Sequence, residues 1–200
     1  MTDPLSRRRF LAGVGGASAL FGAAALAHAV APIGPFSLKE PRARAGSPQD
    51  VPVNRSARQA DVTALALDPA WMLQVTSGDT TRAFTAVDLE ALPQRTATLP
   101  IACVEGWTVD ASWTGVRLRD LLATVDAPEN STIRFRSMQQ RGAFRATTMP
   151  PQYVSDPLTL IALRLNGERL DVDHGYPARV IAPGRPGVLQ TKWLSSIEVV

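Results

Sequence analysis

The stretch that decides the fold is Pro100-Ile101-Ala102-Cys103-Val104-Glu105-Gly106-Trp107, an apolar run that contains the only cysteine of the 200 residues. A single thiol closes no disulfide within the chain, and with His28 and His174 as the only histidines there is no cysteine-rich zinc site. Three interpretations of the thiol stay open: an inert buried group, a nucleophile, or a soft ligand to a metal held mainly by a non-protein group. Residue statistics alone favour burial.

The composition of the whole chain is that of one globular domain, with 45% apolar residues. Most of the formal net charge of +3 lies in residues 1–29, where three arginines and one aspartate leave +2. The remainder is close to neutral, so charge does not favour nucleic-acid binding. Lysine is rare in this arginine-rich chain and occurs only as Lys39 and Lys192.

The amino terminus has the pattern of an export signal. Ser6-Arg7-Arg8-Arg9-Phe10-Leu11 leads into a small-residue apolar stretch that ends at Ala27-His28-Ala29. This is typical of a twin-arginine signal peptide over residues 1–29, cleaved before Val30, and an uncleaved signal anchor is the alternative. We expect a periplasmic, secreted or cell-envelope protein. The twin-arginine route carries folded proteins, commonly with a cofactor inserted.

Residues 30–68 are rich in Pro, Ala, Arg, Ser and Asp and lack sustained periodicity, so composition alone predicts an extended tether over the surface. The folded domain is predicted over residues 69–200. Alternating segments predict strands at 71–75, 95–104, 131–137, 143–149, 176–182 and 195–200.

Two short helices and one hairpin complete the predicted domain. Thr85 is the expected N-cap of a helix that Pro93 ends, and leucines at 118, 121 and 122 share one helical face. Asn166-Gly167, between apolar runs, predicts a two-residue hairpin turn. The fold class expected is therefore α+β, with mostly antiparallel strands and short helices.

The motifs around the cysteine resemble a known superfamily. Cys103-Val104-Glu105-Gly106-Trp107, followed by Trp113-Thr114-Gly115-Val116-Arg117-Leu118, resembles the molybdenum-ligand segment of the sulfite-oxidase fold, in the form found in the periplasmic methionine-sulfoxide reductase catalytic subunit. The resemblance continues through 156–160, 165–168, 174–180 and 183–192 and covers roughly residues 69–200. It implies the sulfite-oxidase-like molybdopterin-binding fold.

The resemblance also implies a molybdenum–molybdopterin cofactor whose metal is bound by the Cys103 thiolate. A thiolate is a soft, electron-rich donor, and the pterin dithiolene supplies further sulfur ligands. Positions that match the family's cofactor contacts are then expected to bind the pterin and its phosphate: Asn54, Ala57, Arg58, Ser137, His174, Arg179, Gln190, Thr191 and Lys192. Arg179 and Lys192 suit the phosphate because both are cationic.

Departures from the family pattern bear on the substrate. Sulfite oxidases have basic residues after the cysteine segment, and here Glu105, Gly106 and Trp107 stand there, which disfavours sulfite. The reductase has aromatic residues after Pro183, whereas this chain has Gly184-Arg185-Pro186-Gly187, so Arg185 becomes the candidate for an anion-attracting residue at the substrate mouth. The dimerisation domain of sulfite oxidases has no counterpart before Val200, so a monomeric catalytic unit is expected.

These features predict an exported oxidoreductase that transfers an oxygen atom to or from a small or protein-bound substrate, of sulfoxide type rather than sulfite. A separate membrane or soluble protein would exchange the electrons, because the sequence has no haem-attachment motif and no nucleotide-binding fingerprint. A cofactor-free secreted binding or structural module on the same fold is the alternative function. A thiol nucleophile at Cys103 is a third interpretation, although no cysteine-protease signature surrounds it.

Overall fold

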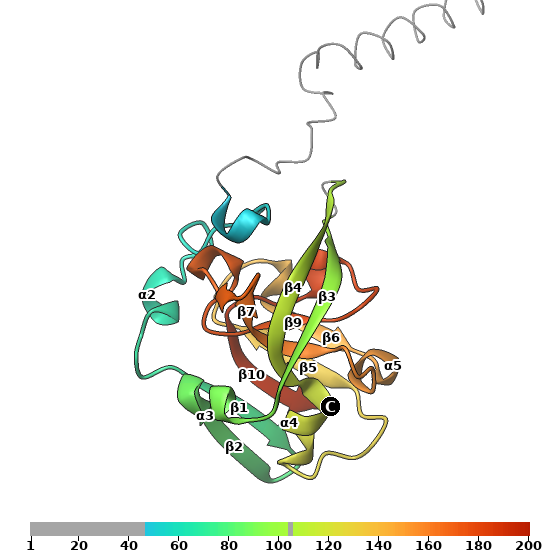
Figure 1. Cartoon of the computed structure of the whole chain (residues 1–200). Helices are drawn as coiled ribbons and strands as arrows, with labels where there is room; N and C mark the ends of the chain where they lie inside the picture. Colours follow the sequence, from blue (N-terminus) through green and yellow to red (C-terminus); the bar gives the residue numbers. More distant parts are fainter. Residues whose placement is uncertain (1–46, 104–105) are drawn as a thin grey trace, which may run out of the picture. The chain divides into compact units, whose positions relative to one another are not determined.

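The computed structural model describes residues 47–103 and 106–200 (Figure 1). The export signal predicted for residues 1–29, the first part of the predicted extended segment and Glu105 lie outside the described residues. In the part that is described, strands predominate and the helices are short. This confirms the α+β fold class expected from the sequence.

One five-stranded sheet has the order β2-β1-β10-β5-β6. Its strands are β1 (Met72–Ser77), β2 (Thr80–Thr85), β5 (Ile133–Ser137), β6 (Ala146–Met149) and β10 (Leu194–Val199). β1 and β10 run parallel, whereas the other neighbouring strands in this sheet are antiparallel. The first described strand is thereby paired with the last one, which joins distant parts of the chain in one sheet.

The second sheet has the order β3-β4-β7-β8, and β9 also pairs with β7. Its strands are β3 (Gln94–Ala102), β4 (Thr108–Arg117), β7 (Leu160–Leu165), β8 (Glu168–Arg169) and β9 (Arg179–Ile181). All of its pairings are antiparallel. β3 and β4 form a long ribbon, and Cys103 follows directly where β3 ends (Figure 1).

Both helices that the sequence predicts are present, and two further short helices were not predicted. The helices are α2 (Thr63–Ala66), α3 (Ala86–Ala91), α4 (Leu118–Ala123) and α5 (Pro151–Val154), with 3₁₀ turns η2 (Pro48–Asp50), η3 (Ala143–Arg145), η4 (Val172–His174) and η5 (Gly187–Leu189). Thr85 caps α3 in a reciprocal capping box with Asp88, and the leucines of α4 are all buried. None of the helices in the described part is long and apolar enough to cross a membrane.

The hairpin between β7 and β8 confirms the turn predicted from Asn166-Gly167. Both residues have positive φ, at 50° and 84°, as a two-residue turn of this type requires. The sequence prediction omitted β2 and β4. β2 is exposed at four of its first five positions and also at its last, so it lacks the alternation of a half-buried strand.

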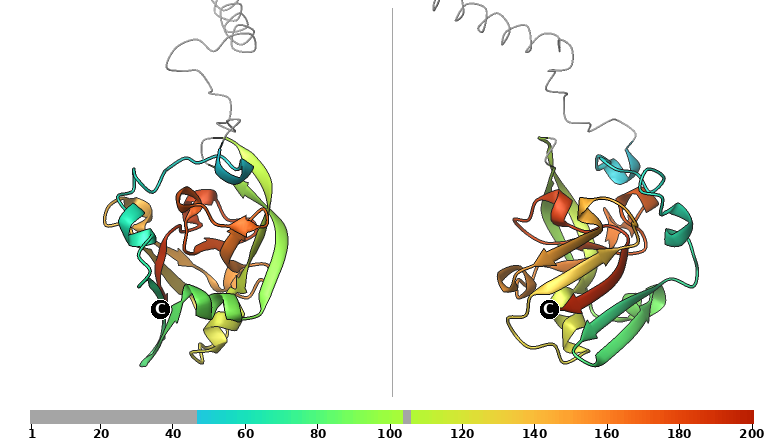
Figure 2. Two further views of the ribbon diagram at one scale, coloured as in Figure 1. Left: turned by 60° about the vertical axis from the view of Figure 1, so that its left-hand side comes forward. Right: turned by 180° about the vertical axis from the view of Figure 1, so that it is seen from behind.

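Buried side chains form two clusters: the larger one takes residues from both sheets, and the smaller one packs on the second sheet. The larger cluster contains Leu73, Leu121, Phe135 and Trp193, and the smaller one contains Trp113 and the partly buried Cys103. The segment 47–57, called the strap below, runs along the same end of the domain as the tip of the β3–β4 ribbon (Figure 2).

The strap and the residues after it are more buried than the predicted surface tether. Val51 and Ala57 are each 1% exposed, and Val62 and Ala66 also lie in the core. Periodicity cannot reveal this burial, because an irregular segment buries isolated side chains at uneven intervals. The described part of the predicted extended segment therefore belongs to the folded domain.

Candidate functional site

Cys103 lies in a tight turn that the end of β3 and the start of β4 hold together. Its backbone N–H donates to Trp107 O at 2.8 Å, and the Gly106 N–H donates to Cys103 O at 3.0 Å. Gly106 has φ +91°, a conformation that L side chains rarely adopt. The turn presents a half-buried thiol to a pocket rather than to the centre of the core.

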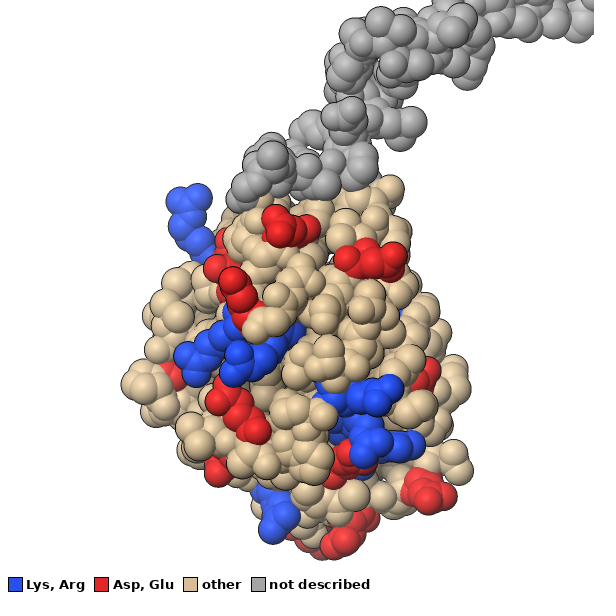
Figure 3. Space-filling view, in the orientation of Figure 1, with Lys and Arg blue, Asp and Glu red and all other residues tan. Residues whose placement is uncertain are grey.

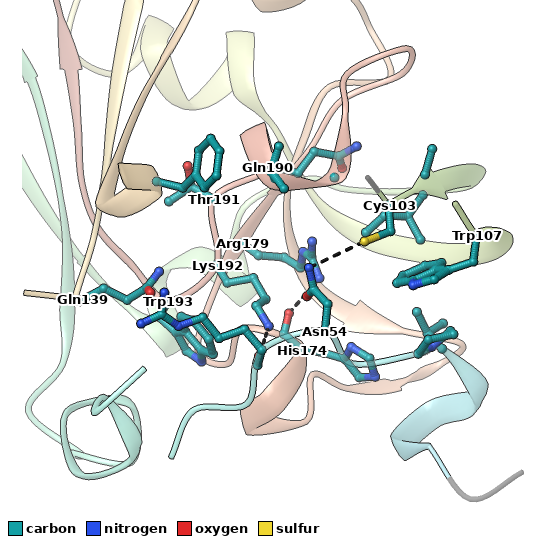
Figure 4. Close-up of a pocket in the computed structure, with 18 residues that line it drawn as sticks. Asn54, Cys103, Trp107, Gln139, His174, Arg179, Gln190, Thr191, Lys192 and Trp193 are labelled. Carbon is teal, nitrogen blue, oxygen red and sulfur yellow. Dashed lines mark hydrogen bonds between the residues drawn. The ribbon is translucent and has the colours of Figure 1, made fainter. Parts of the chain in front are cut away.

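The pocket contains about 730 Å³ of atom-free space, including its open mouth (Figure 4). Four elements line it: the strap, the ends of β3 and β4, the loop 138–145 and the segment 174–193. The structure brings together seven of the residues predicted for the site, which are Asn54, Cys103, His174, Arg179, Gln190, Thr191 and Lys192. These residues come from regions more than a hundred positions apart in the sequence.

Asn54 belongs to the strap and contacts the sulfur. Its Nδ2 donates to Cys103 Sγ at 3.6 Å, and Figure 4 shows the amide directed at the sulfur. An amide N–H is a suitable donor to a sulfur acceptor. The strap thus provides a polar neighbour for the sulfur inside the pocket.

Two cations line the same pocket as the thiol. Arg179 donates to His174 O at 2.9 Å and stacks over Trp113 at 5.0 Å, while Lys192 Nζ donates to Arg55 O at 2.6 Å and to Asp173 O at 2.7 Å. Among the described residues, neither cation forms an ion pair with a carboxylate. A buried and a half-buried cation without a carboxylate partner are suited to an anionic ligand.

Burial affects the protonation of these cations. It lowers the pKa of the Lys192 ammonium to about 7, with the positive charge of Arg179 as the next contribution, and it also lowers the pKa of the Arg179 guanidinium. Arginine remains protonated in proteins at neutral pH, so Arg179 keeps its charge. An anion bound here would offset the desolvation of both groups.

His174 is 2% exposed and ends the η4 turn beside the strap. Its Nε2 lies 2.7 Å from Pro48 O, and burial lowers its pKa to about 4, so the ring is neutral at physiological pH and Nε2 carries the proton that it donates to this carbonyl. Gly175 follows with φ +111°, and an added Cβ would lie 3.0 Å from Lys192 Cβ and 3.1 Å from Arg179 Cβ. Glycine here lets the backbone pass beside both cations.

Three residues that line the pocket have buried polar atoms without a hydrogen-bond partner among the described residues: Trp107 Nε1, Arg179 Nε and Gln190 Oε1. Such atoms cost roughly 1–3 kcal/mol each when they stay unpaired. Two are donors and one is an acceptor. Their position indicates a polar ligand that presents complementary groups to the pocket.

The remaining predicted site residues do not line the pocket. Ser137 lies behind it and donates to Lys192 O at 2.8 Å, Ala57 is buried and donates its N–H to Asp173 Oδ1, and Arg58 is exposed. Arg185 was expected at the substrate mouth, and this placement is wrong: its side chain is 5% exposed, and Nη2 donates to Thr148 O. An arginine in a loop is usually exposed to solvent. The burial of Arg185 depends on how its loop packs against β6.

The sequence prediction also missed residues of the pocket wall. Arg55, Gln139, Phe144 and Val188 line the pocket, and Phe144 stays 48% exposed at its edge. Arg55 is adjacent to the predicted site residue Asn54, so the sequence could have indicated it. No sequence signal marks the other three residues. Among the described residues, no cluster of three His, Cys, Asp or Glu side chains is suited to hold a metal. A metal beside Cys103 would therefore need most of its ligands from a non-protein group.

The fold and this pocket define a domain in which a cysteine, an arginine and a lysine line one cavity. Residues 59–200 match the family described as "Oxidoreductase molybdopterin binding domain", and the chain belongs to that family. The expected resemblance to the sulfite-oxidase-fold molybdopterin proteins is thereby confirmed.

Individual relatives agree with this family. The sulfite oxidase of Arabidopsis thaliana is 29% identical over 146 residues, which are 56% of this chain and 37% of that protein. The NADH nitrate reductase of Volvox carteri is 40% identical over 98 residues, 44% of this chain and 11% of that protein. The sulfane dehydrogenase SoxCD of Paracoccus pantotrophus matches in structure with a TM-score of 0.59 and 25% identity, over 67% of this chain and 40% of that chain. The matched region is thus well under half of each relative.

Proposed function

We propose that the protein is an exported molybdenum–molybdopterin oxidoreductase that transfers an oxygen atom to or from an organic substrate. One observation carries the proposal: Trp107, Arg179 and Gln190, each with a buried polar atom that has no partner among the described residues, line the same pocket as Cys103 and Lys192. The residues present fit the cofactor of the family, because a pterin offers both hydrogen-bond donors and acceptors and its phosphate is anionic.

Each part of the pocket has a distinct task in this proposal. The Cys103 thiolate would be the protein ligand of the metal, and Asn54 would donate to its sulfur. Arg179 and Lys192 would neutralise the phosphate, and Gln190 would accept from the ring system. When bound, the cofactor would supply the change of oxidation state that accompanies oxygen transfer.

The pocket rim supports an organic substrate over a small inorganic dianion. The side chains of Phe144, Val188, Ile101 and Trp107 line the opening or the wall beside Cys103. Apolar and aromatic side chains favour the carbon substituents of a sulfoxide or an N-oxide, and Phe144, Val188 and Ile101 provide no hydrogen bonds to a free oxyanion. Reduction of such a substrate consumes an electron pair and two protons and releases water.

Export and a separate redox partner complete the proposal. They rest on the predicted signal at residues 1–29 and on the lack of haem and nucleotide motifs in the sequence. On the face drawn in Figure 3, basic and acidic side chains are interspersed, which gives no support to a nucleic-acid partner.

Metal and pterin analysis of the wild type and of Cys103→Ser tests the proposal. We expect near-stoichiometric molybdenum and a pterin in wild-type protein from a host that makes the cofactor. The Ser variant should lose activity by more than the roughly 10–100-fold that changes around a metal ligand cost. Ala123→Ser adds the same hydroxyl at an exposed position of α4 and serves as the control.

The substrate class is tested with dye donors and dye acceptors on sulfoxides, N-oxides and sulfite. Turnover of apolar sulfoxides or N-oxides in preference to sulfite is expected. Folded wild-type protein that contains neither molybdenum nor pterin would contradict the proposal and favour the cofactor-free module. Full activity of Cys103→Ser would equally contradict it.

A further inference from the structure

The loop between β9 and β10 is tied to β6 and α5 by one buried arginine. Arg185 Nη2 donates to Thr148 O at 2.9 Å, and its guanidinium carbon lies 5.6 Å from the centre of the Tyr153 ring. Thr147 Oγ1 and Thr191 Oγ1 form a second tie at 2.8 Å between β6 and the end of the same loop. The loop is therefore fixed at both ends against β6.

The main chain of this arginine determines how Gln190 is oriented. Gln190 Nε2 donates to Arg185 O at 2.8 Å, so the amide nitrogen faces the loop, and Oε1 is the atom left for a ligand. Gln190 lines the pocket, is 2% exposed, and its Oε1 has no partner among the described residues. An amide held on one side only by a single carbonyl keeps its orientation while that carbonyl stays in place.

The same loop also packs against the strand end that carries the cysteine. An added Cβ on Gly187 would lie 2.6 Å from Ala102 O, so glycine allows the two main chains to meet directly before Cys103. Movement of the loop would thus change the pocket wall next to the thiol as well as the direction of Gln190.

We propose that Arg185 is a positioning residue, whose side chain fixes the loop 182–190 on β6 and Tyr153 so that the loop carbonyl holds Gln190 with its acceptor oxygen directed to the pocket. The ligand that this site takes presents an N–H or O–H donor at Gln190. The inference deepens the proposed function and rests on it for the identity of that ligand alone.

A buried arginine is a costly choice for a purely structural contact. Burial lowers the pKa of Arg185, and its Nη1 has no partner among the described residues. A hydrophobic side chain would fill the same space without this desolvation. What the guanidinium adds is a directional bond to Thr148 O, which sets the position of the loop.

Hydrogen exchange of cofactor-free protein tests this directly, in Arg185→Met, Arg185→Lys and the exposed control Arg82→Met. We expect Arg185→Met to raise amide exchange in residues 186–192 by about tenfold, the loss that one charge-assisted hydrogen bond produces, while exchange in β1 and β5 stays unchanged. Arg185→Lys keeps the charge over Tyr153 and a donor, so it should restore most of the protection. Arg82→Met should match the wild type.

A second readout follows the Gln190 amide. Its side-chain protons should give a distinct, protected NMR signal in the wild type and in Arg185→Lys, and this signal should be lost in Arg185→Met. In loaded enzyme, Arg185→Met should lower the molybdenum and pterin retained per protein more than it changes the turnover per bound metal. If Arg185→Met does not fold, Tyr153→Leu weakens the same clamp and should show the same local exchange.

Three results would overturn the inference: unchanged exchange in 186–192, an equal rise across all strands, or no rescue by lysine. Wild-type protein without molybdenum would defeat the proposed function, yet the exchange and NMR comparison would still test the role of Arg185.

Discussion

The two walls of the pocket are built in different ways. The segment 174–193 is fixed by packing on either side of its loop: Ala178, Val180 and Trp193 are fully buried in the larger core cluster, and Gly175 allows close contact with its neighbours. The strap, residues 47–57, is held mainly by polar bonds that single side chains make over long distances in the sequence.

These strap bonds are few and can be named. Gln49 forms three side-chain hydrogen bonds, to Leu165 O, Arg169 O and the Asp171 N–H. His174 contacts Pro48 O, and Lys192 donates to Arg55 O. One wall therefore depends on the whole fold, and the other can be loosened without unfolding the domain. Cys103 lies between them, with its Asn54 contact on the strap side.

The largest expected effect comes from Gly175→Ala in the packed wall. Positive φ and contacts of 3.0–3.2 Å to Lys192 and Arg179 should together lower the free energy of unfolding by about 3 kcal/mol. Urea unfolding of cofactor-free protein measures this loss. Gly78→Ala is the matched control, because Gly78 has φ +53° and nothing within 4 Å of an added Cβ. It should lose about 1 kcal/mol, and equal losses in both variants would contradict the packing argument.

Much of the packed wall and of the two sheets could be predicted from the sequence. Apolar residues that recur at regular intervals mark the buried face of a strand or a helix. The turn at Asn166-Gly167 and the Thr85 cap depend on their own and adjacent residues, so they are evident from the sequence alone. The cationic residues Arg179 and Lys192 came from the family resemblance. The structure brings both to the pocket that Cys103 lines.

The strap and Arg185 could not be predicted in the same way. The burial of Val51 and Ala57 depends on a few hydrogen bonds to residues more than a hundred positions away, such as that between Ala57 N and Asp173 Oδ1. Arg185 is buried because β6 supplies Thr148 O and Tyr153 packs nearby, which no local pattern encodes. Long-range polar bonds are thus where sequence reasoning failed.

An intermediate effect is expected from acid, through the His174 contact that joins the two walls. The pKa of His174 falls from its ordinary 6.5 to about 4 on folding, because burial disfavours the charged ring. The unfolded chain therefore binds the proton first, and stability should decrease as pH falls from about 6.5 toward 4. We expect about 2 kcal/mol over this window.

His174→Gln supplies the matched variant for this pH test. Glutamine keeps a donor for Pro48 O and removes the titration, so urea unfolding of the variant should depend less on pH between 4 and 6.5 than that of the wild type. Parallel pH profiles for the two proteins would show that His174 does not link the walls in this way.

The smallest effect on global stability is expected from Gln49→Ala. This variant tests the difference between the two walls most directly. Loss of two half-buried hydrogen bonds and one exposed one should lower the free energy of unfolding by only about 1 kcal/mol, because water replaces the protein partners. The strap itself should open about five times as often, so trypsin should cut after Arg55 or Arg58 about fivefold faster than in the wild type. Gln152→Ala, at an exposed position of α5, is the control and should leave the cleavage rate unchanged. Faster cleavage at sites throughout the domain would mean that the strap is part of the cooperative core, and the contrast between the two walls would then not hold.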